Sequence, residues 1–150
     1  HLNSTKITDT AIEHLIKCDF KQLQELKLSL TNITNKAVKH LVKCDFKQLR
    51  VLDLSGTKIT RHLVKCDFKF LEVLDLSGTK IASTAVEHLI KCDLKNLKKF
   101  NLNHTEITDI AVKHLIKCDF KQLQSLYISR NKITDIAVKH LIKCDFKQLQ

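Results

Sequence analysis

A unit of 26 residues repeats along the chain, and this self-similarity restricts the fold more than any other feature of the sequence. Such a repeat predicts a stack of similar units, each covering the apolar face of its neighbour. The leucines that open the units lie 26, 22, 26, 26 and 26 residues apart: Leu23, Leu49, Leu71, Leu97, Leu123 and Leu149. We therefore predict a single domain over residues 1–150, with units at 1–22 (partial), 23–48, 49–70 (short), 71–96, 97–122 and 123–148.

The first half of each unit predicts a short strand followed by a turn. Its first six residues read L-x-x-L-x-L, and this alternation indicates a strand with one buried face. The ninth position is Thr or Asn, whose side chain can hydrogen-bond to backbone groups where the chain turns. The eleventh position is isoleucine in every unit, and we expect it to be buried: Ile7, Ile33, Ile59, Ile81, Ile107 and Ile133.

The second half of each unit predicts a short amphipathic helix. Thr108 and Asp109 supply an N-cap hydroxyl and a first-turn carboxylate, which suit a helix start and its dipole. Ala111 and Leu115 follow on an apolar face, and such a short helix needs the sheet beneath it to be stable. The short unit lacks four residues after Thr60, so we expect a single turn or an extended link there and a local packing defect.

The strand pattern L-x-x-L-x-L-x-x-(N/C/T)-x-I resembles the leucine-rich repeat, and the continuation I-T-D-x-A-V-x-H-L resembles its cysteine-containing subtype. That subtype occurs behind F-box domains and in some bacterial effectors. The resemblance covers all 150 residues. It implies an α/β fold, a right-handed leucine-rich-repeat solenoid with a parallel concave sheet and short convex helices. It also implies a non-enzymatic protein-binding scaffold in the cytoplasm, or in the host cytosol if the protein is a secreted bacterial effector.

In such a fold, side chains that alternate with the buried strand residues point into the concave hollow. These positions vary more between units than the helix and isoleucine positions do, and a variable surface on a constant frame is where a partner would bind. Tyr127 and Arg130 are the anchors we expect, because Tyr and Arg are favoured at interfaces. The predicted site for a protein partner comprises Glu25, Lys27, Val51, Asp53, Val73, Asp75, Lys99, Asn101, His104, Tyr127 and Arg130.

One cysteine recurs in each unit: Cys18, Cys44, Cys66, Cys92, Cys118 and Cys144. We interpret them as a ladder of small buried apolar residues, because disulfide frameworks place several cysteines within each small unit. This interpretation favours a reducing compartment. The alternative is an extracellular, glycosylated recognition receptor, since Asn3, Asn32 and Asn103 begin N-x-S/T sequons. The repeat pattern supplies these threonines, so we interpret the sequons as chance matches.

The formal net charge of +10 comes largely from lysines that recur on the predicted helices and the loops after them, such as Lys113, Lys117 and Lys121. We interpret this lysine ridge as a solvated convex face. The alternative is binding of nucleic acid or anionic lipid, although the ridge lacks aromatic side chains for base stacking. We predict no membrane span. The uncapped ends of the stack could associate with each other.

Catalytic and metal-binding patterns are weak in this sequence. It contains no Walker A loop, no G-x-S-x-G and no paired-cysteine zinc motif. His114 and Cys118 have the i,i+4 spacing of a metal pair, but we expect them to face opposite sides of the helix. Asp53 and Asp75 could act as an acid–base pair, but an open sheet does not exclude water. We therefore predict no catalytic residue, no metal and no cofactor.

Overall fold

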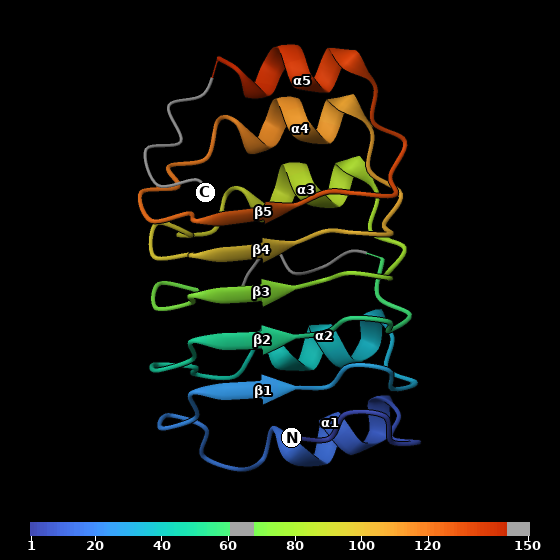
Figure 1. Cartoon of the computed structure of the whole chain (residues 1–150). Helices are drawn as coiled ribbons and strands as arrows, with labels where there is room; N and C mark the ends of the chain where they lie inside the picture. Colours follow the sequence, from blue (N-terminus) through green and yellow to red (C-terminus); the bar gives the residue numbers. More distant parts are fainter. Residues whose placement is uncertain (61–67, 144–150) are drawn as a thin grey trace.

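The computed structural model describes residues 1–60 and 68–143. Within these residues, five strands form one parallel sheet whose strand order follows the chain order (Figure 1). Each strand has three residues, as expected when only the start of each unit pairs with its neighbours. The strands are β1 (Glu25–Lys27), β2 (Val51–Asp53), β3 (Val73–Asp75), β4 (Lys99–Asn101) and β5 (Ser125–Tyr127).

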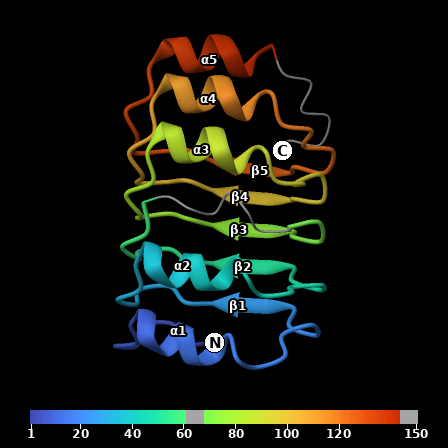
Figure 2. The ribbon, with the colours of Figure 1, turned by 180° about the vertical axis from the view of Figure 1, so that it is seen from behind.

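Five helices of seven residues each lie in a second layer on one side of this sheet, within the described part of the chain (Figure 2). Neighbouring helices pack in the pairs α1 with α2, α3 with α4 and α4 with α5. Every unit therefore contributes one strand, one helix or both to a two-layer stack. The helices are α1 (Asp9–Leu15), α2 (Asn35–Leu41), α3 (Ser83–Leu89), α4 (Asp109–Leu115) and α5 (Asp135–Leu141).

The turn after each strand is closed by the side chain at the ninth position, as predicted. The Thr31 hydroxyl donates to the Leu28 carbonyl at 2.7 Å, and the Thr79 hydroxyl donates to the Leu76 carbonyl at 2.6 Å. In the last unit, the Asn131 side-chain amide takes this role and donates to the Ile128 carbonyl at 2.9 Å. The same local bond in successive units gives each turn the same shape.

The apolar core runs without interruption between the sheet and the helices. Ile33, Ile59, Ile81 and Ile107 are at most 2% exposed, which confirms their predicted burial. The equivalent Ile7 and Ile133 are only partly buried, because they belong to the outermost units. Leu52 and Leu74 in the central strands are also buried. The repeat therefore buries its apolar positions between units as well as within them.

The helix starts differ from the predicted local caps. The Thr34 hydroxyl accepts from the Lys36 amide at 3.2 Å, but Thr8 and Thr108 make no side-chain cap hydrogen bond. The carboxylate of Asp109 instead accepts from the amide of Thr134 at 2.8 Å and from its hydroxyl at 2.7 Å. A side chain predicted to stabilise its own helix thus binds the helix start of the next unit.

The prediction of a buried cysteine ladder is wrong for the described cysteines. Cys18 is exposed, and Cys44, Cys92 and Cys118 are half-buried. The reason is local: the Cys44 amide donates to the Leu41 carbonyl at 3.0 Å and closes the helix end, which leaves the cysteine near the rim of the stack. Cys66 and Cys144, and the predicted turn or link of the short unit, lie outside the described residues.

Candidate protein-binding face

The parallel register brings the predicted binding residues together in two rows on the open sheet face, the face that points away from the helices. The row at the strand starts comprises Glu25, Val51, Val73, Lys99 and Ser125. The row at the strand ends comprises Lys27, Asp53, Asp75, Asn101 and Tyr127. Between these rows, Leu52, Leu74 and Phe100 are buried in the core, and Leu26 and Leu126 are partly buried, so both rows are presented at the surface.

The central carboxylates of this face are held by hydrogen bonds. Oδ1 of Asp53 accepts from the Ser55 amide at 3.0 Å and from its hydroxyl at 2.7 Å. Oδ1 of Asp75 accepts from the amide of Ser77 at 2.9 Å and from its hydroxyl at 2.6 Å. Oδ2 of Asp75 accepts from the Asn101 side-chain amide at 2.9 Å, which ties β3 to β4. The two carboxylates therefore keep defined orientations.

The C-terminal half of the face is also connected across strands. Oδ1 of Asn103 accepts from the Ser129 amide at 2.7 Å and from its hydroxyl at 2.9 Å. His104 and Arg130 follow β4 and β5, and Nε2 of His104 lies 2.8 Å from a guanidinium nitrogen of Arg130. Tyr127 is 46% exposed. The structure thus places all eleven predicted residues on one face, with the two predicted anchors at its C-terminal end.

A hollow of about 500 Å³ lies where the chain leaves the strands, and two of the predicted binding residues, Asn101 and His104, line it. Its floor is formed by Gly56 and Gly78, whose φ angles are 63° and 65°. A Cβ on Gly56 would come within 2.5 Å of the Leu30 side chain, whereas a Cβ on Gly78 would have no neighbour closer than 3.5 Å. Glycine occupies the same position of these two adjacent units. The lining residues are Ser29, Leu30, Ser55, Gly56, Ser77, Gly78, Asn101, Asn103 and His104.

A charged network crosses three units just before the strands. The carboxylate of Glu72 accepts from Nζ of Lys98 at 2.7 Å and pairs with the guanidinium of Arg50. The hydrogen bonds from Lys98 and Arg50 lower the pKa of Glu72. The negative charge of Glu72 is therefore neutralised along the edge of the sheet where the strands begin.

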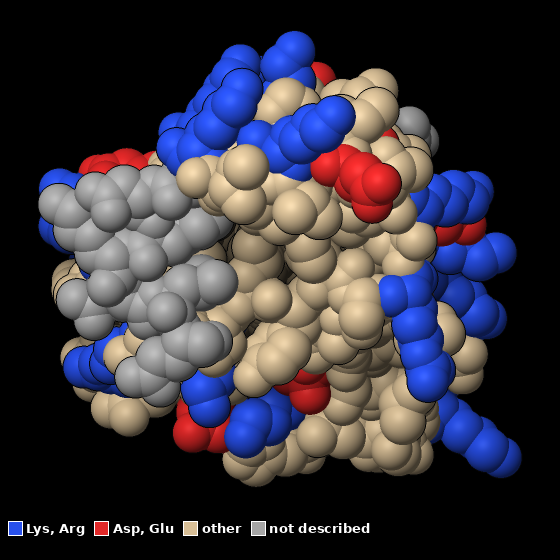
Figure 3. All heavy atoms as spheres, turned by 45° about the horizontal axis from the view of Figure 1, so that its top comes forward, with Lys and Arg blue, Asp and Glu red and all other residues tan. Residues whose placement is uncertain are grey.

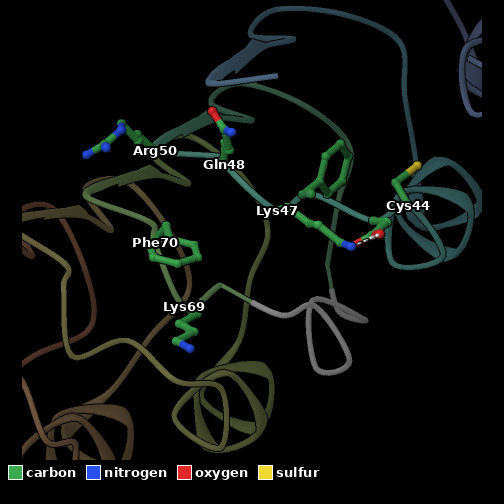
Figure 4. A pocket seen from close by; sticks show the side chains of 8 residues that line it. Cys44, Lys47, Gln48, Arg50, Lys69 and Phe70 are labelled. Carbon is green, nitrogen blue, oxygen red and sulfur yellow. Dashed lines mark ion pairs between the residues drawn. The ribbon is translucent and has the colours of Figure 1, made fainter. Parts of the chain in front are cut away.

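A second cavity, of about 550 Å³, lies between the loops that precede β2 and β3 (Figure 4). Nζ of Lys47 pairs with Asp45 at 3.3 Å, and Nζ of Lys69 lies 5.6 Å from the ring centroid of Phe70. None of the eleven predicted residues lines it. This cavity is therefore separate from the predicted binding face.

The lysines of the convex side are exposed, as at Lys113, Lys117 and Lys121. The loop lysine in several units is paired with an aspartate two residues before it, as Lys121 is with Asp119 at 3.4 Å and Lys95 is with Asp93 at 2.9 Å. These pairs neutralise part of the ridge locally, which supports its interpretation as a solvated surface.

Residues 1–60 and 68–143 contain neither a candidate metal site nor a candidate membrane span. No group of three or more His, Cys, Asp or Glu side chains in these ranges could hold a metal ion. No helix among the described elements has the length and apolarity needed to cross a bilayer.

Comparison with known proteins identifies the repeat. A family model described as leucine-rich repeats in two copies matches residues 95–143, which span parts of the last three units. Residues 95–143 are leucine-rich repeats. Such repeats generally mediate protein–protein recognition and are typically non-enzymatic scaffolds. The cysteine-containing subtype stays a prediction. No curated protein matches the sequence.

Two solved leucine-rich-repeat structures share the fold. An internalin (inlF) from Listeria monocytogenes matches with a TM-score of 0.65 and 21% identity, over 93% of this chain and 37% of the internalin chain. A plant peptide hormone receptor, RGFR1, in complex with RGF2 matches with a TM-score of 0.52 and 17% identity, over 87% of this chain and 24% of the receptor chain. The chain thus spans well under half the length of these two structures.

Proposed function

We propose that the open sheet face, which is the concave face of a leucine-rich-repeat solenoid, binds a partner protein. One observation carries the proposal: the side chains that differ from unit to unit stand in register and are tied to one another by hydrogen bonds. Asp75 is bonded to Asn101, and Asn103 is bonded to Ser129 in the next unit. A partner would meet a surface that is already ordered, so that little side-chain entropy is lost on binding.

The C-terminal end of the face is where we place the binding anchors. Tyr127 presents a large, half-exposed ring, and a guanidinium nitrogen of Arg130 lies 2.8 Å from Nε2 of His104. Tyr and Arg account for a large share of binding energy at protein interfaces because they combine apolar area with directed hydrogen bonds. The partner surface should offer an apolar or aromatic patch to Tyr127 and an acceptor to Arg130.

Photo-crosslinking tests the choice of face. A benzophenone side chain at Tyr127 should crosslink the partner, whereas the same group at Ile110 should not, although Ile110 on α4 is 61% exposed. The crosslinked partner, once identified and purified, allows affinity measurements. We expect the Tyr127→Ala, Arg130→Ala double variant to lower affinity at least about a hundredfold, or about 3 kcal/mol.

The matched control is a Lys113→Ala, Lys117→Ala double variant on the convex side, which should keep its affinity. Equal affinity of the concave double variant and the unaltered protein would refute the proposed face. If only the convex variant loses affinity, the partner binds the lysine ridge and not the open sheet face.

We further propose that the protein acts in the cytoplasm, or in the host cytosol if it is an effector. The cysteine pattern supports this proposal: each unit has one cysteine, whereas disulfide frameworks of secreted proteins place several cysteines within each small unit. In protein purified from its natural source, thiol titration should find every cysteine reduced. Paired cysteines, or glycans at Asn3, Asn32 or Asn103, would instead favour the extracellular receptor.

A further inference from the structure

The eighth position of each unit has left-handed backbone, and only two units place glycine there. The φ angles at this position lie between 54° and 65° for Ser4, Leu30, Gly56, Gly78, His104 and Arg130. Because four of these residues carry side chains, the turn itself does not require glycine. The chain contains only two glycines, and both stand side by side in the floor of the hollow. What glycine supplies at these two positions is therefore open space.

Leu30 forms one wall of this space, and the fold gains little from it. Its side chain is 65% exposed, and its φ of 54° is unfavourable for leucine. The Leu30 side chain leans over Gly56, since a Cβ on Gly56 would come within 2.5 Å of its Cδ2. An exposed apolar side chain on strained backbone is typical of binding sites. On the opposite side the hollow is lined by His104.

The floor of the hollow leaves exposed backbone whose hydrogen bonds are already made. The Gly56 amide donates to the Ser77 carbonyl at 2.7 Å, and the Gly78 amide donates to the Asn103 carbonyl at 2.9 Å. The hydroxyls of Ser55 and Ser77 donate to the aspartates of their own units. A polar occupant would thus find these donors already in use. An aromatic ring, in contrast, is the group that covers exposed glycine backbone in a sheet.

Two carboxylates stand beside the hollow, those of Asp53 and Asp75, which are opposite each other in the register. Among the described residues, no Lys or Arg side chain forms an ion pair with either of them. Lys27, opposite Asp53 on the other side, pairs with Glu25 at 2.9 Å instead. Figure 3 shows the molecule obliquely, with Lys and Arg side chains gathered toward the edges of the view and a largely uncharged surface between them. A basic side chain of a partner can therefore neutralise the two aspartates.

We propose that the hollow binds an aromatic side chain of the partner that has a Lys or Arg beside it. The inference rests on the proposed function, because it names the group that a partner of the open sheet face inserts. The ring lies on Gly56 and Gly78, and the basic side chain reaches Asp53 and Asp75. A cavity of about 150 Å³ holds a benzene molecule. The hollow of about 500 Å³ thus has room for the largest aromatic side chain.

Selective labelling makes the test sharp, because Gly56 and Gly78 are the only glycines in the chain. Protein labelled with nitrogen-15 in glycine alone gives two amide signals, and both come from the floor of the hollow. The probe is the peptide acetyl-Arg-Trp-Arg-amide, titrated into the millimolar range. Both signals should shift and approach saturation, because the ring current of the indole acts on nearby amides. If neither signal shifts, the proposal is wrong.

Three related peptides test the chemistry of the occupant. Acetyl-Arg-Ala-Arg-amide should leave both glycine signals unmoved. We expect acetyl-Arg-Leu-Arg-amide, which has no aromatic ring, and acetyl-Glu-Trp-Glu-amide, which has the opposite charge, to bind at least about fivefold more weakly. Equal binding of the leucine peptide would overturn the assignment of an aromatic group. Equal binding of the acidic peptide would overturn the role of the two aspartates.

Gly78→Asn fills the hollow, and asparagine tolerates left-handed backbone better than most residues do. The remaining Gly56 signal should then report binding of acetyl-Arg-Trp-Arg-amide that is at least about tenfold weaker. Ser4→Asn is the matched control, since it introduces the same residue at the same position of a unit that does not line the hollow. This variant should bind the peptide like the unaltered protein. Equal binding by both variants would contradict the proposal.

Leu30→Asn separates binding from folding. The variant removes the apolar wall and relieves unfavourable backbone, so its urea midpoint should be unchanged or higher while the peptide binds at least about threefold more weakly. A lower urea midpoint with unchanged peptide binding would show that Leu30 serves the fold and would overturn its role in the hollow.

The partner identified by crosslinking at Tyr127 separates this inference from the proposed function. Gly78→Asn should lower the affinity of that partner at least about tenfold. If the partner tolerates Gly78→Asn but is lost in the Tyr127→Ala, Arg130→Ala double variant, the open sheet face stands and the hollow is refuted. If the peptide binds the hollow but Tyr127 crosslinks nothing, the hollow stands and the anchors are refuted.

Discussion

At the scale of single residues, different side chains make the same contact between neighbouring units. In this contact, which we call the latch, the side chain of the first helix residue accepts a hydrogen bond from the backbone N–H of a threonine in the next unit. Asp9 and Asp109 accept through carboxylates, Asn35 through an amide oxygen and Ser83 through a hydroxyl. What the position requires is an oxygen acceptor that reaches the amide of a threonine in the next unit. The negative charge of aspartate adds attraction to the partial positive charge at the helix start.

Removing one latch should therefore destabilise the stack measurably. We expect Asp9→Ala to lower the free energy of unfolding by about 1 kcal/mol, as for loss of a helix N-cap acceptor. Asp135→Ala makes the same change where the carboxylate has no described partner and should cost less than about 0.5 kcal/mol. Urea unfolding at low protein concentration, where association is negligible, measures both. Equal losses would show that the latch does not stabilise the junction.

The latch carboxylates also predict an acid-sensitive stability. Burial would raise the pKa of Asp9, but the hydrogen bonds from Thr34 and Ala37 outweigh it, so the pKa is lowered from 3.8. The backbone and side-chain hydrogen bonds from Thr134 lower the pKa of Asp109 in the same way. The unfolded chain therefore binds more protons than the folded one in acid. This contribution is fully present above the unfolded pKa and is lost as the pH falls below it.

Urea midpoints measured between about pH 6 and pH 2 should accordingly fall with the pH below about 4. The Asp9→Asn, Asp109→Asn double variant keeps an acceptor, as Asn35 does in the second unit, but it cannot titrate. Its midpoint should fall less steeply with pH. An unchanged slope would assign the acid sensitivity to other carboxylates, such as Glu72.

At the scale of elements, no strand or helix of this chain is stable by itself. Strands of three residues and helices of seven are too short to persist without neighbours. Each helix packs against the preceding unit with one apolar side and against the following unit with another. Ala137 is buried against the preceding unit, and Val112 is buried against the following unit. The stability of an element therefore depends on how many neighbours it has.

A pair of identical substitutions tests this dependence. Val112→Ala removes two carbons from a site that α5 covers completely and should cost about 2 kcal/mol. Val138→Ala removes them from a half-exposed site in the last helix and should cost less than about 1 kcal/mol. The measurement is urea unfolding of dilute protein. Similar losses would mean that the last junction is covered in solution even under dilute conditions.

At the scale of the whole molecule, contacts run only between neighbouring units, so the ends should open before the middle. Amide hydrogen exchange should be fastest in α1 and α5 and slowest in β2, β3 and β4. The strands β2 and β3 are each paired on both sides, and their leucines are fully buried. Uniform exchange rates across the chain would contradict a nearest-neighbour stack.

The features that could be predicted from sequence are those that each unit specifies locally. The strand leucines, the turn threonines and the buried isoleucines repeat with the period of the fold, and Thr79 and Ile81 lie as expected. The latch was missed because its partners are 25 residues apart and because Thr-Asp also suits a local cap. The exposure of Cys18 and the shape of the hollow at Gly78 depend on how neighbouring units are placed against each other. The sequence pattern of a single unit does not specify this placement.

The register between β2 and β3 is unbroken, with Asp53 opposite Asp75, although their units open only 22 residues apart. The unit at 49–70 has four residues fewer than the others, yet the residues of β3 stay in the same two rows as those of β2. Insertions and deletions between Thr60 and Phe68 can thus be absorbed away from the side chains that would choose a partner. The length of the segment that returns to the sheet and the side chains of the open sheet face can therefore change independently in such a chain. Segments of other lengths grafted between Thr60 and Phe68 should leave the two rows of side chains in the same register.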